Sequence, residues 1–301
     1  MTTASFAPQG PFSLASSIRF LEGFTPASYD HAADGLLRLA FPADDHHSVI
    51  GCALRQKEAV GEPGVVSAEF TVHADSAAGK AARNQIARIL SLDIDGTGFP
   101  AVGERDPVVA SLWAEFPGLR PVCFHSPYEA AAWAVIGHRI RKTQAAAIKG
   151  RLARDHGRPV DVAGRRLHAF PTPAVLRALA RIPGLTDVKI ERLHAIAEAA
   201  LDGDLDASAL RARDADQALK DLQSLPGIGP FSAELILIRG AGHPDLFPTA
   251  EPRVHRAVAT EYGLGEAPGL SRLAAIADAW RPYRSWVALL LRARMAATGG
   301  G

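Results

Sequence analysis

The sequence predicts an α+β protein in which an antiparallel sheet precedes a helical body. Short runs rich in β-branched and aromatic residues occupy the first part of the 301 residues, as in Gly35–Phe41, His47–Arg55 and Gly64–His73. Such runs, bounded by turn residues, are typical of strands. Later in the chain the apolar residues recur at helical spacing instead. Strands and helices that are segregated along a chain in this way predict an α+β fold.

We expect two domains, at residues 1–119 and 120–301, because the chain is about twice as long as a typical domain. With 22% charged and 48% hydrophobic residues, the composition argues against a disordered chain. The first domain has 8 Lys and Arg against 14 Asp and Glu, whereas the second has 25 against 18. A surface that binds a polyanion is therefore expected mainly in the second domain.

The sequence also argues against several classes of protein. Cys52 and Cys123 are too few for a disulfide framework, and no Cys-x-x-Cys pair suggests zinc or an iron–sulfur cluster. The first residues lack the basic and apolar segments of a signal peptide, and no apolar run is long enough to cross a membrane. We expect a cytoplasmic protein with no membrane partner.

The helical part begins at a recognisable N-terminal signal. Ser126 and Glu129 form a capping box around Pro127, which favours a helix through Ile136. The polar segment 156–167, with two glycines and a proline, predicts a loop. The other expected helices are at about 78–91, 142–153, 174–180, 190–201, 215–224, 231–239, 253–262, 270–280 and 285–295.

The most specific motif is Leu225-Pro-Gly-Ile-Gly-Pro-Phe-Ser-Ala233, which lies between two expected helices. Its two glycines permit backbone conformations closed to other residues, and Pro230 suits the first turn of a helix. The start of that helix offers free N–H groups and the positive end of a dipole to a phosphate. The motif predicts binding to double-stranded DNA; the alternative is a plain glycine-rich helix connection. The residues expected to bind are Gly227, Gly229, Phe231, Ser232 and Ala233.

The chain resembles a known family on this motif and on segments around it. The stretch Ala218–Arg256 resembles the helix-hairpin-helix DNA glycosylases, and the 3-methyladenine DNA glycosylase II type is the most similar. Ala132–Ile140 is similar to that family's first conserved helix and DNA-wedging turn. Phe170–Pro173 is similar to its Phe-Pro-Thr-Pro segment, and Trp280–Trp286 to its C-terminal motif. The resemblance implies a body of two helical subdomains, with the hairpin at about 215–240.

What the resemblance implies about function is a monomeric, monofunctional DNA N-glycosylase of base excision repair. Such an enzyme flips a damaged base, here an alkylated purine, out of duplex DNA and releases it by hydrolysis. It needs no cofactor. The resemblance also implies a structural Na⁺ or K⁺ at the hairpin, held by the backbone carbonyls of Gln223, Leu225 and Ile228.

The family has a catalytic Asp just before the helix that follows a Phe-Pro loop beyond the hairpin, and this chain has Glu251 there, followed by Pro252. A carboxylate at this place stabilises the positive charge that develops as the sugar–base bond breaks. Glu is a poor N-cap, so a role as a cap alone is hard to justify. Two interpretations stay open: Glu251 is catalytic, or the chain is a catalytically impaired homologue that recognises DNA damage. Asp245 is a weaker catalytic candidate and is expected to be a solvated turn residue.

The expected base pocket departs from the family. Phe231 stands where bifunctional relatives have a lysine nucleophile, so no lyase activity is expected. Leu235 and Arg292 stand at positions that are aromatic in the alkylbase enzymes. A pocket with little π-surface, and with an arginine in it, favours cationic bases less.

The expected wedge turn differs too, with His138, Arg139 and Ile140 in sequence. His138 or Ile140 is a candidate to fill the gap left by an extruded base. Arg139 and the cations after it are expected to contact phosphates, together with Arg253 on the helix behind Glu251.

Overall fold

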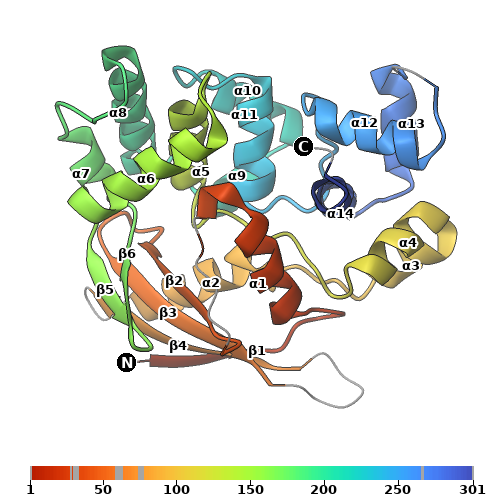
Figure 1. Ribbon diagram of the computed structural model, residues 1–301, viewed down its shortest axis with the longest axis horizontal. Coiled ribbons are helices and arrows are strands. Elements are labelled where there is room, and N and C mark those ends of the chain that lie inside the picture. Colours follow the sequence, from red (N-terminus) through yellow and green to blue (C-terminus); the bar gives the residue numbers. More distant parts are fainter. Residues whose placement is uncertain are drawn as a thin grey trace.

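The computed structural model describes residues 2–27, 29, 34–57, 64–73, 78–265 and 268–299. It has an antiparallel sheet with strand order β1-β4-β3-β2 and a larger set of helices (Figure 1). The α+β fold is therefore confirmed. Within these residues, no helix combines the length and apolar character needed to cross a membrane. The elements are β1 (Thr2–Phe6), α1 (Leu14–Gly23), the 3₁₀ turn η1 (Thr25–Ala27), β2 (Leu37–Pro42), β3 (Val49–Gln56), β4 (Val66–His73), α2 (Ala78–Ile89), α3 (Phe99–Arg105), α4 (Pro107–Glu115), α5 (Pro127–Gly137), α6 (Lys142–His156), β5 (Pro159–Val162), β6 (Arg165–His168), α7 (Pro173–Arg177), α8 (Asp187–Leu201), α9 (Ala207–Ala212), α10 (Ala215–Gln223), α11 (Pro230–Leu235), the π-helical turn η2 (Ile236–Gly240), α12 (Pro252–Glu261), α13 (Leu270–Asp278) and α14 (Arg284–Ala297).

The three strands expected from the sequence correspond to β2, β3 and β4, which pair in antiparallel register. The sequence analysis did not assign β1, which adds to the edge of β4. Helices α1 and α2 cover the sheet through buried residues such as Ile18 and Ile86, which pack with Leu37 and Ile50. The sheet and these two helices share one apolar core.

The prediction of a loop at 156–167 is wrong, because β5 and β6 form an antiparallel hairpin there. Its apolar face packs on the main sheet, where Val160 and Val162 join a buried cluster. Gly51 on β3 makes the contact possible: a Cβ at this glycine would lie 2.4 Å from Val160 Cγ1. The glycine that suggested a loop, Gly164, lies in the hairpin turn at φ +78°.

The helical body has two apolar cores, which agrees with the two expected subdomains. One core lies around α5, α8 and α11, and the other around α12, α13 and α14. Helices α3 and α4, which precede residue 119, pack with the second core through Phe99 and Leu112. The domain boundary at 119 stays a prediction, but the end of its first domain packs with the last helices of the chain.

The capping box at the start of α5 is confirmed in part. The Ser126 hydroxyl accepts the N–H of Glu129 at 3.1 Å. The Glu129 carboxylate does not serve as a cap; it is buried, 2.6 Å from Lys149 Nζ and 2.8 Å from His125 Nδ1. Burial raises its pKa, but the charges of His125 and Lys149 outweigh this and hold the pKa of Glu129 well below its usual range. These contacts fix α6 against α5, and so fix the turn between them.

Candidate functional site

The hairpin between α10 and α11 has two glycines with different roles. Gly227 has φ +88°, and a Cβ there would lie 2.6 Å from Cδ of Arg192, so this position requires glycine. Gly229 has φ −96°, which any residue adopts, and a Cβ there would meet nothing within 4 Å. The prediction of a special conformation is therefore confirmed for Gly227 and wrong for Gly229. The open space at Gly229 lies on the outside of the hairpin.

The start of α11 exposes fewer N–H groups than expected. Ala233 is buried, and its N–H donates to the Gly229 carbonyl at 2.9 Å. The prediction that Ala233 offers a free N–H is wrong, because α-helical hydrogen bonding begins there. The N–H groups of Phe231 and Ser232 precede this first bond. The Phe231 side chain is 46% exposed, although it is a large aromatic.

A basic face lies beside the hairpin, and sequence reasoning missed half of it. Arg192 reaches Gly227, and Lys189, one turn earlier on α8, donates to the Ile136 carbonyl at 2.8 Å. The pKa of exposed His138 is lowered, first by partial burial and then by the charges of Arg139, Arg192 and Lys189. The i, i+3 spacing of Lys189 and Arg192 was the available signal, but the helix predicted from the sequence began only at residue 190, whereas α8 begins at Asp187.

The turn between α5 and α6 holds an arginine in a strained conformation. Arg139 is exposed and has φ +56°, in the left-handed region that non-glycine residues rarely adopt. Strain of this kind is retained where the surrounding structure imposes it, often at functional sites. The turn thus presents His138 and Arg139 outward, whereas the other predicted wedge residue, Ile140, is half-buried and packs against the core around α5 and α8.

We expect Arg139→Gly to leave the unfolding temperature unchanged or slightly higher, because glycine removes about 1–2 kcal/mol of left-handed strain. The same variant should bind duplex DNA more weakly and lower the slope of log K against log salt by about one, as for one lost phosphate contact. Anisotropy titrations at several salt concentrations measure this slope. Arg139→Lys is the charge-matched control. An unchanged slope in Arg139→Gly would contradict the phosphate contact.

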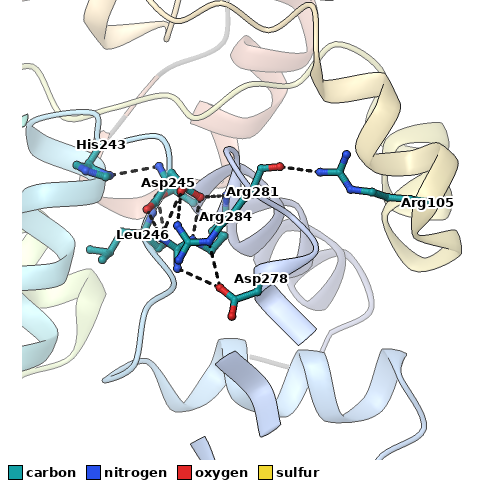
Figure 2. A network of polar contacts seen from close by, with 8 residues as sticks. Arg105, His243, Asp245, Leu246, Asp278, Arg281 and Arg284 are labelled. Atoms are coloured by element: carbon teal, nitrogen blue, oxygen red, sulfur yellow. Dashed lines mark hydrogen bonds and ion pairs between the residues drawn. The ribbon is translucent and has the colours of Figure 1, made fainter. Parts of the chain in front are cut away.

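The loop that leads to α12 is anchored at its beginning by the C-terminal motif (Figure 2). Asp245 accepts hydrogen bonds from Arg284 Nε at 2.8 Å and from Arg281 at 3.0 Å. Ser285 accepts the N–H of Leu246 and donates back to its carbonyl, both at 3.0 Å. Asp245 is therefore neither a solvated turn residue nor a free carboxylate. It fixes the loop to the start of α14.

The end of the same loop is held by a residue that sequence reasoning missed. Glu234 on α11 is buried, and its carboxylate accepts hydrogen bonds from the N–H groups of Thr249 and Ala250. His255 on α12 adds a contact of 2.9 Å between its Nε2 and the Pro248 carbonyl. The residues just before Glu251 are thus held from two helices.

Glu251 itself is half-buried at the N-cap of α12, where Oε1 accepts the N–H of Arg253 at 3.3 Å. The expectation that Glu is a poor N-cap is only partly right, since the hydrogen bond from the Arg253 N–H forms but is long. The carboxylate has cationic neighbours, and its negative charge acts to raise the pKa of Lys142 and of half-buried Arg292. Burial lowers the pKa of Arg292, and Glu251 opposes this shift.

Comparison with known proteins shows similarity to DNA repair glycosylases over part of their length. No protein-family model matches the chain. The probable bifunctional transcriptional activator/DNA repair enzyme AlkA of Mycobacterium tuberculosis is 33% identical over 205 residues, which cover 66% of this chain and 40% of that protein. DNA-3-methyladenine glycosylase 2 of Escherichia coli is 30% identical over 186 residues, which cover 59% of this chain and 61% of that protein. The chain thus spans less than two thirds of these relatives.

The fold is similar to that of a solved glycosylase over nearly its whole length. The 3-methyladenine DNA glycosylase of Archaeoglobus fulgidus has a TM-score of 0.74 and 23% identity, with 96% of both chains covered. The chain thus has the fold of this solved DNA glycosylase. In sequence it is similar to DNA-3-methyladenine glycosylases, in agreement with the resemblance of its motifs to the 3-methyladenine DNA glycosylase II type.

The expected pocket residues come from two helices. Phe231 and Leu235 are four residues apart on α11 and so share a face. Arg292 lies on α14, where it interacts electrostatically with Glu251, Arg253 and Arg256. The predicted contributions of these residues to a base pocket stay predictions.

The hairpin carbonyls expected to hold a monovalent cation are compatible with that role. The Leu225 carbonyl accepts the N–H of Ile228 at 3.0 Å and keeps a second lone pair. Within the described part of the chain, no N–H donates to the carbonyls of Gln223 or Ile228. Oxygen atoms without a donor suit a hard cation.

Proposed function

We propose that the chain is a monofunctional DNA N-glycosylase of base excision repair. It binds double-stranded DNA as a monomer, extrudes a damaged base, an alkylated purine, and hydrolyses the bond between base and sugar. We place this activity in the cytoplasm, on nucleoid DNA. The observation that carries the proposal is Glu251, a half-buried carboxylate on a loop anchored to the hairpin helix. The similarity to DNA-3-methyladenine glycosylases supports the same reaction.

The residues divide the reaction between binding and chemistry. Phosphates are bound by the hairpin and by Lys189, Arg192 and Arg139. The side chain of His138, next to Arg139 in the turn, fills the space that the base leaves. Glu251 stabilises the positive sugar and orients a water molecule. The water oxygen bonds to the anomeric carbon, the bond to the base nitrogen breaks with its electron pair leaving on the base, and the water proton passes to the carboxylate.

Two features limit this chemistry. Phe231 offers no amine, so the abasic sugar is released without lyase cleavage. A Na⁺ or K⁺ at the carbonyls of Gln223, Leu225 and Ile228 would supply a positive charge that the hairpin shares with a DNA phosphate. The enzyme needs no other cofactor.

The test of the proposed function is a release assay on duplexes that each carry one lesion, covering methylated purines and deaminated or oxidised bases. Excess protein is incubated with each duplex, and alkali then cleaves the abasic sites formed. Release of at least one methylated purine is expected. If the protein binds duplex DNA and releases no base from any of them, it is the damage-recognition homologue and the enzymatic proposal is wrong.

The hairpin's part in binding is tested by Gly229→Gln. A Cβ at this position meets nothing within 4 Å, and the backbone conformation suits any residue, so the unfolding temperature should change little. It does occupy the space where we place a phosphate. Duplex affinity at fixed salt should fall by at least about tenfold, since a hydrogen bond to a charged group contributes roughly 1.5–3 kcal/mol.

The matched control is Gly265→Gln, a glycine that is also exposed and open on all sides but lies after α12. Its affinity for the duplex should equal that of the native chain. Equal affinities of the two variants would contradict the role of the hairpin.

A further inference from the structure

Glu234 is a buried carboxylate whose hydrogen bonds all go to one short segment. Its side chain is 4% exposed. Oε1 accepts the N–H and the hydroxyl of Thr249, both at 2.7 Å, and both carboxylate oxygens accept the N–H of Ala250, at 3.1 and 3.0 Å. A carboxylate is expensive to bury, and hydrogen bonds to an ionised acceptor are the strong kind that offset the expense.

The position of these bonds links the two halves of the site. Glu234 lies on α11, the helix whose start we expect to bind the DNA backbone. Ala250 directly precedes Glu251 in the chain. Three peptide units or fewer therefore separate the anchored N–H groups from the carboxylate that meets the sugar. The apolar core of α11 belongs to one helical subdomain and α12 to the other, so this contact spans both.

We propose that Glu234 is a positioning residue, which fixes Glu251 relative to the DNA phosphates bound at the hairpin. The proposal rests on the proposed function. A helix that binds the backbone and also holds the catalytic loop sets the distance from phosphate to carboxylate by its own rigid geometry. Misplacing a reacting group by about 1 Å can slow a reaction by about a hundredfold.

A purely structural role makes a different prediction. A residue that only stabilises the fold lowers the unfolding temperature and slows the reaction independently of Glu251. A residue that acts through Glu251 has no further effect once the Glu251 carboxylate is gone. Double-mutant cycles separate these cases.

The experiment compares native protein, Glu234→Gln, Glu251→Gln and the double variant in single-turnover release of a methylated purine, with protein in excess. Gln keeps the shape of Glu but replaces one acceptor oxygen with an NH₂ group that faces an N–H donor. We expect Glu234→Gln to slow release by about ten- to a hundredfold with duplex affinity retained. The double variant should be no slower than Glu251→Gln. Additive losses, or an undiminished rate in folded Glu234→Gln, would overturn the proposal.

Thr249→Val is the second variant, for use if Glu234→Gln does not fold. It removes one hydrogen bond to Glu234 and leaves the carboxylate and both N–H groups in place. A smaller loss of rate is expected, again with none in the Glu251→Gln background. A loss that persists in that background contradicts positioning.

Hydrogen exchange gives a readout that does not depend on turnover. Binding of undamaged duplex should slow exchange of the Thr249 and Ala250 amides in native protein and not in Thr249→Val or Glu234→Gln. Equal slowing in native and variant proteins overturns the proposal. A native protein that releases no base but shows the expected exchange pattern would refute the proposed function and leave the link between hairpin and loop supported.

Discussion

Replacing Glu251 with glutamine is expected to slow base release by about a hundred- to a thousandfold, which corresponds to roughly 3–4 kcal/mol of transition-state stabilisation. The amide has no negative charge to stabilise the sugar cation. Its oxygen can still accept the N–H of Arg253, so the start of α12 and the unfolding temperature should be preserved. Single-turnover release of a methylated purine, with duplex affinity measured in parallel, tests this.

Two variants calibrate the result. Glu251→Asp restores the residue type that the family uses, keeps the charge and is a better N-cap, so it should retain most of the rate and raise the unfolding temperature. Glu191→Gln removes an exposed carboxylate on α8 and should change neither the rate of base release nor the unfolding temperature. Full activity in Glu251→Gln would show that another group stabilises the sugar. Asp245 is a poor substitute, because two arginines already occupy its oxygens.

The parts of the site that could be predicted from sequence depend on local structure. The hairpin, the cap at Ser126 and the carboxylate before Pro252 all follow from residues a few positions apart, which set the ends of helices. For this reason Glu251 lies at the N-terminus of α12, as predicted. The same local logic was wrong at Ala233, where the N–H is already used in a helical hydrogen bond, and at Gly229, whose backbone conformation does not require glycine.

The parts that could not be predicted depend on contacts between distant segments. The β5–β6 hairpin exists because Gly51, more than a hundred residues earlier, leaves room for Val160. Glutamate is usually found on protein surfaces, and the hydrogen-bond partners of Glu234 lie fifteen and sixteen residues later, in a loop. Nothing in the pattern around it indicates burial.

Arg120 is the strongest case of such a contact and carries the other large prediction. It is fully buried, and its guanidinium donates to the carbonyls of Gln9, Pro11, Ser91 and Ile94. The guanidinium also lies 5.1 Å from the centre of the Trp286 ring on α14. Burial lowers the pKa of Arg120 to about 10, so it stays charged at neutral pH. Arg120 thus joins the carbonyls of segments 9–11 and 91–94 to the Trp286 ring on α14.

Arg120→Met should therefore destabilise the protein by at least about 3 kcal/mol, because it leaves several buried carbonyls without a donor. The unfolding temperature should fall by about 5 °C or more. The matched control is Arg105→Met, since Arg105 also donates to backbone carbonyls, of Ala101, Ala279 and Arg281, but is exposed. Figure 2 shows its contact with Arg281. Water replaces its bonds, so that loss should stay below about 1 kcal/mol.

The comparison decides what joins the N-terminal segment to the last helix. If Arg120→Met and Arg105→Met unfold at the same temperature, the carbonyls at Arg120 are rehydrated on substitution and the apolar core around Phe99 and Trp286 suffices. If only Arg120→Met is destabilised, the N-terminal sheet is secured to the second helical core by one charged side chain. In that case release of base by Arg120→Met at low temperature should equal that of native protein, because Glu251 and the hairpin are held by separate contacts.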